Sequence, residues 1–199
     1  DLKNTSIGEM ARTVREKMQV NGFHVKMTRV NPSEWTYKDI QNTILEYEAN
    51  GYEVQLLMLD YLYKVPTTGC TQGPAGTDIV DMFDRLRNFT SSRKITLVTP
   101  HQISTEGKQL VRDGHSDFVK KIAGGGYYEG SKRIDQVVDG EIYIHIEKLN
   151  NMAYLTVQRG KHRIPDVIPD AHMYFVLPFP KKGSILDDLD KPKISMSKV

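Results

Sequence analysis

Two polar side chains each follow an apolar run that is typical of a buried β-strand. Asp60 comes near the end of VQLLMLDYL at residues 54–62, and Gln102 follows KITLVTP at residues 94–100. A carboxylate at the end of such a strand can hold Mg²⁺, usually through water, against the phosphates of a nucleotide. A glutamine placed there can orient water or contact the terminal phosphate. Both residues also have a plainer explanation, because an aspartate can cap the turn that follows and a polar residue often comes after a buried strand.

The elements that must position these residues alternate between helices and strands. Apolar residues spaced by three and four predict amphipathic helices over residues 6–20, 36–49 and 78–89. Thr36 and Asp39 stand close to the spacing of a capping box, and Gly51 provides a stop for the second helix. Residues 23–27 are a short strand candidate, and the turn-rich segment 66–77 predicts a loop.

The second half of the chain predicts antiparallel strands. Residues 141–149 and 153–159 alternate in character around Asn150-Asn151, which indicates a hairpin, and residues 172–179 form a last strand. With the two buried strands and their helical crossover, the pattern predicts an α/β fold. Its mostly parallel sheet is expected to be covered on both faces by helices, with antiparallel strands at one end. Ligands of such folds bind beyond the carboxyl ends of the parallel strands, which is where Asp60 and Gln102 are expected to lie.

Composition limits the class of protein. The 199 residues include 27 basic and 25 acidic side chains, a formal net charge of +2, which is ordinary for one globular domain and excludes a disordered charged tail protein. No apolar run approaches the roughly 18 residues that a membrane helix needs. The single cysteine, Cys70, excludes an intramolecular disulfide framework and a cysteine-rich zinc site, and it fits a reducing cytoplasm. The histidines lack the spacing of a metal site, so we expect them to be structural.

A glycine-rich segment, residues 120–133, carries a local excess of positive charge. It holds four basic side chains and one acidic one, a local net charge of +3, around the triplet Gly124-Gly125-Gly126. The basic side chains can contact nucleic-acid phosphates without sequence specificity, and the tyrosines can stack on bases. The alternative is a solvated, mobile loop. The candidate DNA-binding residues are Lys120, Lys121, Tyr127, Tyr128, Lys132 and Arg133.

Five segments, in order along the chain, resemble motifs of DnaB-type replicative DNA helicases. SIGEMA resembles the motif that follows the helix of the phosphate-binding P-loop, LLMLDYL the Walker B strand, and TLVTPHQIS the strand that ends in a functional glutamine. IDQVVDGEIYI and LTVQRG resemble two later motifs, the second of which carries an arginine. The resemblance covers about residues 5–180, is greatest to phage members of the family, and implies a RecA-like fold.

The resemblance also implies roles for individual residues. Glu9 would polarise the attacking water, Asp60 would hold the shell of the metal ion, and Gln102 would link the γ-phosphate to the DNA-binding loops. Arg159 would be an arginine finger in the neighbouring subunit's site, where it stabilises charge on the transferred phosphoryl group. Lys161, in the same basic cluster, would contact the nucleotide or the adjacent subunit. Taken alone, Glu9 can be an acid that complements a helix dipole, and Arg159 a surface arginine of an edge strand.

One motif of the family does not occur in the sequence. The P-loop pattern G-x-x-x-x-G-K-[ST], whose amides and lysine hold the phosphates, is absent from the 199 residues, and Val157 stands where the family has a lysine. The P-loop precedes the Glu-Met motif in the family, so we expect the chain to begin just after it. Residues 1–182 are then expected to form a partial ATPase domain, with a charged tail over 183–199. The missing strand and helix are expected to leave an apolar sheet edge exposed.

These observations predict a function. The chain is expected to be part of an ATP-dependent replicative helicase motor that uses Mg²⁺ and moves on single-stranded DNA, and to be inactive alone. The complete protein is expected to form a homo-oligomeric ring, a hexamer, in the cytoplasm (the host's, if viral), with primase or a helicase loader as a further partner and no membrane. Two alternatives stay open: a recombinase-type RecA-like ATPase, and a non-catalytic RecA-like module that binds DNA or a helicase and regulates it.

Overall fold

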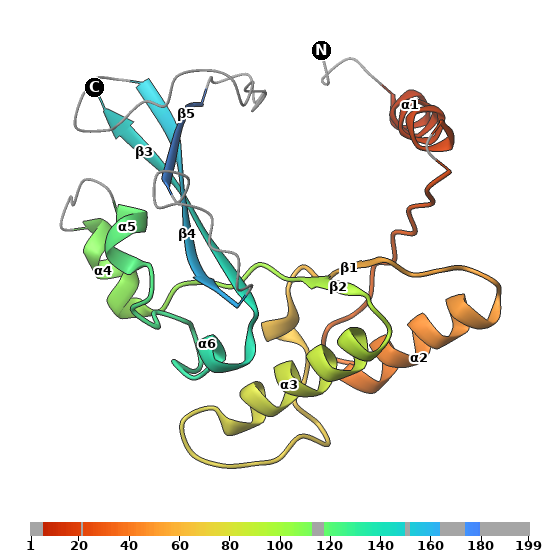
Figure 1. The fold of residues 1–199 in the computed structure, drawn as a ribbon, viewed down its shortest axis with the longest axis horizontal. Helices are drawn as coiled ribbons and strands as arrows, with labels where there is room; N and C mark the ends of the chain where they lie inside the picture. The colour runs from red at the N-terminus through yellow and green to blue at the C-terminus, as the bar shows by residue number, and fades with distance from the viewer. Residues whose placement is uncertain (1–5, 21, 113–117, 150–151, 164–173, 180–199) are drawn as a thin grey trace. The chain divides into compact units, whose positions relative to one another are not determined.

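The computed structural model describes residues 6–20, 22–112, 118–149, 152–163 and 174–179, and Figure 1 shows its helices and strands. The chain divides into two compact units, residues 1–31 and residues 32–199. The predicted tail over residues 183–199 lies outside the described residues, as do Asn150 and Asn151, on which the hairpin was predicted. No helix in the described ranges is long and apolar enough to cross a membrane.

The first unit contains one helix, α1 (Ile7–Gln19), which begins with a capping box. The Glu9 amide donates to Ser6 Oγ at 3.2 Å, and the Ser6 amide donates back to Glu9 Oε2 at 2.9 Å. The strand predicted over residues 23–27 is wrong, because these residues belong to no helix or strand. Alternating apolar residues form a strand only against a neighbouring strand, and none pairs with them in the part of the chain that the structure describes.

Two helices of the second unit, α2 (Tyr37–Ala49) and α3 (Thr77–Ser92), agree with the predicted positions. The Asp39 carboxylate accepts hydrogen bonds from the Thr36 amide and hydroxyl, both at 2.7 Å, and these bonds lower the pKa of Asp39. Gly51 follows α2 with a φ of +83°, a backbone conformation that favours glycine at a helix end. Both helices thus begin within one residue of the prediction, and α2 ends as predicted, whereas α3 continues to Ser92, three residues past its predicted end.

Strands β1 (Leu56–Met58) and β2 (Thr96–Val98) form a parallel pair whose register joins Leu57 to Leu97. One face of the pair packs against a core in which Leu62, Met82 and Leu86 have no exposed surface. Leu62 begins the short 3₁₀ helix η1 (Leu62–Lys64), and the other two residues lie on α3.

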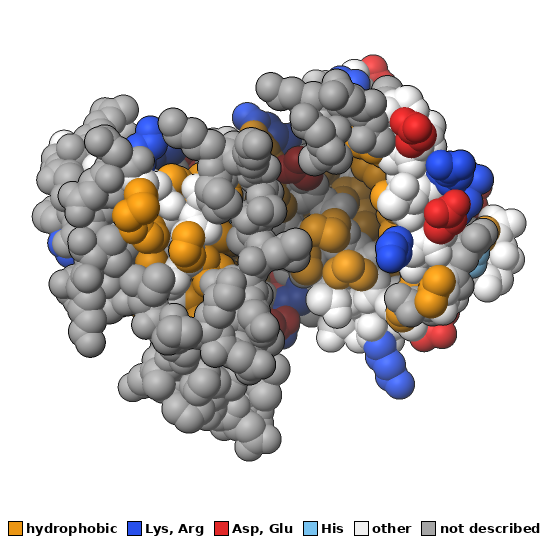
Figure 2. Space-filling model, turned by 90° about the horizontal axis from the view of Figure 1, so that it is seen from above, with side chains coloured by type: hydrophobic (Ala, Val, Ile, Leu, Met, Phe, Trp, Pro, Cys, Tyr) orange, Lys and Arg blue, Asp and Glu red, His pale blue; other side chains and the backbone are white. Residues whose placement is uncertain are grey.

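The opposite face of this pair is open in the described residues. The Leu56 and Met58 side chains are 54% and 69% exposed, and Val98 is exposed beside them. Exposed apolar side chains are visible in orange in Figure 2. The expectation that helices cover both faces is thus wrong for the described residues, since the core lies on one side of β1 and β2 only. In the described residues β2 pairs with β1 alone, and that a missing strand and helix leave the other edge open stays a prediction.

The later part of the chain forms three short helices and an antiparallel sheet, in agreement with the predicted fold class. The sheet order is β3-β4-β5, and it is separate from the parallel pair. One face of this sheet packs on Phe118, Val119 and Ile122 of helix α5, whereas Ile142 and Ile144 on the other face are exposed. The elements are α4 (Thr105–Arg112), α5 (Phe118–Ile122), α6 (Ile134–Val137), β3 (Gly140–Leu149), β4 (Met152–His162) and β5 (Tyr174–Pro178).

The core around α3 gives a prediction for stability. Leu86 is completely buried, so Leu86→Ala should lower the free energy of unfolding by about 2–5 kcal/mol in urea titrations followed by circular dichroism. Leu45→Ala makes the same deletion on α2 at a side chain that is 40% exposed, and it should cost much less. Equal losses for the two variants would contradict this position of the core.

Candidate functional site

The candidate site begins where β1 and β2 end, side by side. Asp60 is exposed just after β1, and the Gln102 amide donates to the Tyr61 hydroxyl at 3.1 Å. Thr99 joins the two strand ends, because its hydroxyl donates to the Leu59 carbonyl and accepts from the Leu62 amide, both at 2.9 Å. The structure thus brings Asp60 and Gln102 to the same end of the parallel pair, as the sequence predicted.

The segment that follows β2 is bonded to the glycine-rich segment. The Glu129 amide donates to the Gln102 carbonyl at 3.0 Å, and the Ser104 amide donates to the Tyr127 carbonyl at 2.8 Å. Ile103 pairs with Tyr128 in an antiparallel bridge between these two bonds. The residue predicted to contact the γ-phosphate and the loop predicted to face DNA are therefore held together through the backbone.

His101 also contacts the glycine-rich segment, through its ring and one ring nitrogen. Its Nε2 lies 2.8 Å from the Glu129 carbonyl oxygen, and its ring meets the rings of Tyr63, Phe83 and Tyr128 edge-on. Burial lowers the pKa of His101, which favours the neutral ring with Nε2 as the donor. A partly buried, hydrogen-bonded ring is a structural histidine, as expected for this residue.

The predicted DNA-binding residues fall into two groups. Lys120, Lys121, Lys132 and Arg133 are exposed, the first two on α5 and the last two just before α6. Their positions permit contact with phosphates. The Lys120 Nζ also lies 3.8 Å from the centre of the Tyr174 ring.

The two tyrosines of this set are partly buried. Tyr127 packs against the cluster of Phe118 and Ile122, and its ring lies so close to Gly125 that a side chain at that position would collide with it. The Tyr128 hydroxyl donates to the Glu141 carboxylate, and burial, with this bond, raises the pKa of Tyr128. Stacking of either ring on bases stays a prediction.

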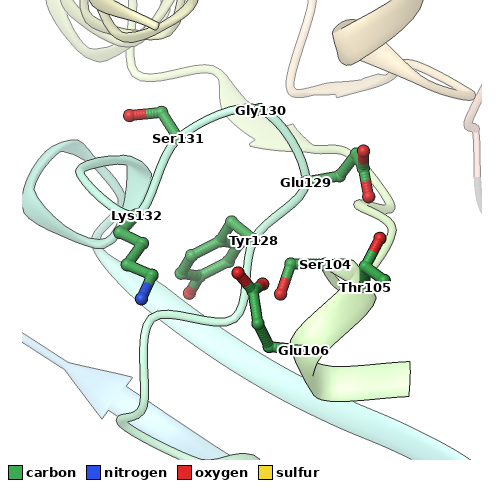
Figure 3. A pocket seen from close by; sticks show the side chains of 8 residues that line it. All are labelled: Ser104, Thr105, Glu106, Tyr128, Glu129, Gly130, Ser131 and Lys132. Atoms are coloured by element: carbon green, nitrogen blue, oxygen red, sulfur yellow. The ribbon is translucent and has the colours of Figure 1, made fainter. Parts of the chain in front are cut away.

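A pocket of about 300 Å³ lies between α4 and the glycine-rich segment (Figure 3). Ser104, Thr105 and Glu106 line it at the start of α4, and Tyr128 to Lys132 line it from the segment. A hydrogen bond from Ser104 lowers the pKa of Glu106, so this carboxylate is charged at neutral pH. Lys132 acts on the Glu106 carboxylate, and Glu129 pairs with Lys108 at 3.8 Å, so the pocket is surrounded by charges of both signs.

The predicted nucleotide contacts on β4 lie beside a carboxylate that sequence reasoning missed. Arg159 is partly buried opposite Ile142 of β3. The Lys161 Nζ donates to the Asp135 carbonyl of α6, and the Lys161 amide donates to Glu141 Oε2 at 3.0 Å. The only sequence feature that indicates a role for Glu141 is its position, as an acid at the start of a predicted strand whose alternate residues are apolar.

Glu9, the predicted catalytic glutamate, belongs to the first unit. It is exposed in the first turn of α1, and hydrogen bonds from the Ser6 amide and hydroxyl lower its pKa. The geometry fits the plainer explanation of an acid that caps its own helix. Its action on a nucleotide stays a prediction, as do the roles of Arg159 and Lys161.

Comparison with known proteins decides the family. A family described as divergent DnaB-like ATPase matches residues 1–199. The chain belongs to this family. No curated protein matches it.

Solved structures show the fold that the DnaB-like chain shares. A DnaB-like replicative helicase, solved with its interactions with primase, matches with a TM-score of 0.60 and 12% identity over 89% of this chain and 40% of that one. A structure described as an ATPase domain matches with a TM-score of 0.56 and 10% identity over 89% of this chain and 59% of the other. The chain thus shares the fold of these ATPase domains, and it spans less than two thirds of either structure.

The link between the strand ends of this DnaB-like domain can be tested at Thr99. Thr99→Val keeps the shape of the side chain but leaves the Leu62 amide without its acceptor, so it should lower the free energy of unfolding by about 1–3 kcal/mol in urea. Thr96→Val makes the same change at an exposed position of β2 and should have little effect. If Thr99→Val were as stable as Thr96→Val, the hydroxyl would not join the strands.

Proposed function

We propose that this chain is part of an ATP-dependent replicative DNA helicase motor that translocates on single-stranded DNA. Membership of the DnaB-like ATPase family supports the ATPase part of this proposal. The observation that carries the rest is the backbone junction between Gln102 and the segment around Glu129. A residue that contacts nucleotide and a loop that contacts DNA must move together in a motor, and these hydrogen bonds give them a mechanical connection.

On the nucleotide side, the chemistry of the residues fits ATP with Mg²⁺. The Asp60 carboxylate is exposed at the end of β1, where it can accept hydrogen bonds from water bound to the ion. Gln102 would then orient toward the γ-phosphate, and Arg159 with Lys161 would act in the site of a neighbouring copy. Glu9 is the candidate base. The 199 residues hold no P-loop pattern, so we propose that this chain alone does not hydrolyse ATP.

On the DNA side, the exposed basic residues Lys120, Lys121, Lys132 and Arg133 are proposed to contact the phosphates of a single strand. Tyr127 is the better stacking candidate of the two tyrosines, because the Tyr128 hydroxyl is bonded to Glu141. A change at Gln102 on nucleotide binding would pass to residues 127–129 through their shared hydrogen bonds.

The assembly proposed for the complete protein is a homo-oligomeric ring, a hexamer, because an arginine finger must reach a neighbouring site. The structural relative solved with primase makes primase a candidate partner. A phage origin and a cytoplasmic location, in a host cell if viral, complete the proposal.

DNA binding is tested by anisotropy with a fluorescent single-stranded oligonucleotide. Lys132→Ala with Arg133→Ala should weaken binding for all sequences and reduce the slope of log affinity against log salt by about 1.4, since each phosphate contact on a single strand contributes about 0.7 to this slope. Lys17→Ala with Lys38→Ala removes the same charge at exposed positions on α1 and α2, and it should leave this slope unchanged. Equal effects of the two pairs of substitutions would contradict DNA binding by the glycine-rich segment.

Nucleotide binding is tested with a fluorescent ATP analogue and Mg²⁺, also by anisotropy. The chain alone should show no binding up to millimolar nucleotide, because the phosphate cradle of a P-loop is not in its sequence. Binding in the micromolar range would mean that the chain holds a complete nucleotide site and would contradict its proposed inactivity.

A further inference from the structure

Glu141 occupies an irregular position in the pairing of β3 with β4. Gly140 pairs with His162 and Ile142 pairs with Arg159. Glu141 alone therefore stands opposite two residues of β4, Gly160 and Lys161, which is the arrangement of a β-bulge. A Cβ at Gly160 would lie 2.7 Å from Glu141 Oε2, so the glycine leaves room for the carboxylate. The carboxylate thus sits directly beside the strand that carries Arg159.

Three donors from three parts of the chain bond to this carboxylate. The Tyr128 hydroxyl, from the glycine-rich segment, donates to Oε1. The Lys161 amide of β4 donates to Oε2 at 3.0 Å, and the Tyr143 hydroxyl of β3 itself donates to Oε2 at 3.2 Å. Hydrogen bonds to a charged acceptor are among the stronger ones in proteins. Two of the three connect Glu141 to elements outside its own strand.

The glycine-rich segment is bonded on its other side as well. Ile103 bridges to Tyr128, and the Gln102 carbonyl accepts from the Glu129 amide at 3.0 Å. A continuous set of contacts therefore runs from Gln102, through Tyr128 and Glu141, to the end of β4. No other carboxylate in the described residues is bonded both to the segment around Tyr128 and to β4.

We infer that Glu141 is a positioning residue, which clamps the glycine-rich segment to the end of β4 so that this segment and Arg159 move as one body. The clamp rests on the contacts of this chain alone. Its consequence rests on the proposed function: in the motor, Glu141 would join the DNA-contacting loop to the arginine that acts on the neighbouring nucleotide.

Amide hydrogen exchange on the full chain tests the clamp without DNA or nucleotide. Tyr128→Phe should speed exchange of the segment 124–133 by about tenfold or more, the factor expected when a hydrogen bond to a charged group is lost. Glu141→Leu should speed exchange of that segment and of the Lys161 amide, because leucine accepts no hydrogen bond from either side, whereas a glutamine amide can still donate to the Tyr128 hydroxyl oxygen. The double variant should match Glu141→Leu, since both changes break the same connection.

Tyr154→Phe is the matched control. It removes a tyrosine hydroxyl from the same sheet, where that hydroxyl donates to Met152 Sδ at 3.8 Å, so exchange of the segment 124–133 should stay within about twofold of the parent chain. Peptides of α3 serve as the reference, because a general loss of stability would speed their exchange too. The clamp is wrong if Tyr128→Phe leaves the segment unchanged, if effects in the double variant add, or if Tyr154→Phe acts like Tyr128→Phe. Should Glu141→Leu fail to fold, Tyr128→Phe and Tyr154→Phe still decide.

Oligonucleotide binding by the same variants separates the clamp from the proposed function. If the parent chain shows the predicted exchange pattern but does not bind single-stranded DNA, the proposed function fails and the clamp stands. If it binds DNA and Tyr128→Phe exchanges like the parent, the function stands and the clamp fails. When both hold, Tyr128→Phe should bind DNA several-fold more weakly than Tyr154→Phe, because its segment must be ordered on binding.

Discussion

The antiparallel bridge between Ile103 and Tyr128 is the contact on which the candidate site depends. It brings a segment that continues from the parallel strands against one that continues into the antiparallel sheet, although those sheets share no hydrogen-bonded strand pair in the described residues. Backbone bonds on either side of it fix the register, and the neutral ring of His101 fills the space beneath. Without the bridge, the position of Gln102 relative to the glycine-rich segment would not be fixed.

The polar groups around the bridge are of two kinds, those bonded within the protein and those exposed at its surface. Groups used for holding the fold are already bonded: the Thr99 hydroxyl, the Tyr128 hydroxyl and the Glu141 carboxylate all have protein partners. Groups suited to a ligand stay at the surface, as with Asp60 and the basic side chains of Lys132 and Arg133. Buried polar groups need such partners, because each one left without a hydrogen bond destabilises the fold.

Local patterns predicted what depends on neighbours in sequence. The capping pair Thr36 and Asp39, the stop at Gly51 and the hairpin of β3 and β4 follow from residues within a few positions of one another. The meeting of Asp60 and Gln102 followed from one further rule, that parallel strands end at the same edge of a sheet. The failures are non-local. Residues 23–27 have strand character, but strand formation depends on a partner that their own sequence cannot specify.

Glu141 and Tyr128 show the same limit within the site. An acid in an alternating strand is usually a solvated side chain, and a tyrosine beside glycines can equally face a nucleic acid. Their pairing across the fold gives each a different surrounding from the one that its neighbours in sequence suggest. Burial raises the pKa of Tyr128, so its phenol stays protonated and can donate to the Glu141 carboxylate. This bond joins the glycine-rich segment to the strand of Arg159. A substitution of Tyr128 or Glu141 should therefore change the mobility of both parts, whatever ligand occupies the site.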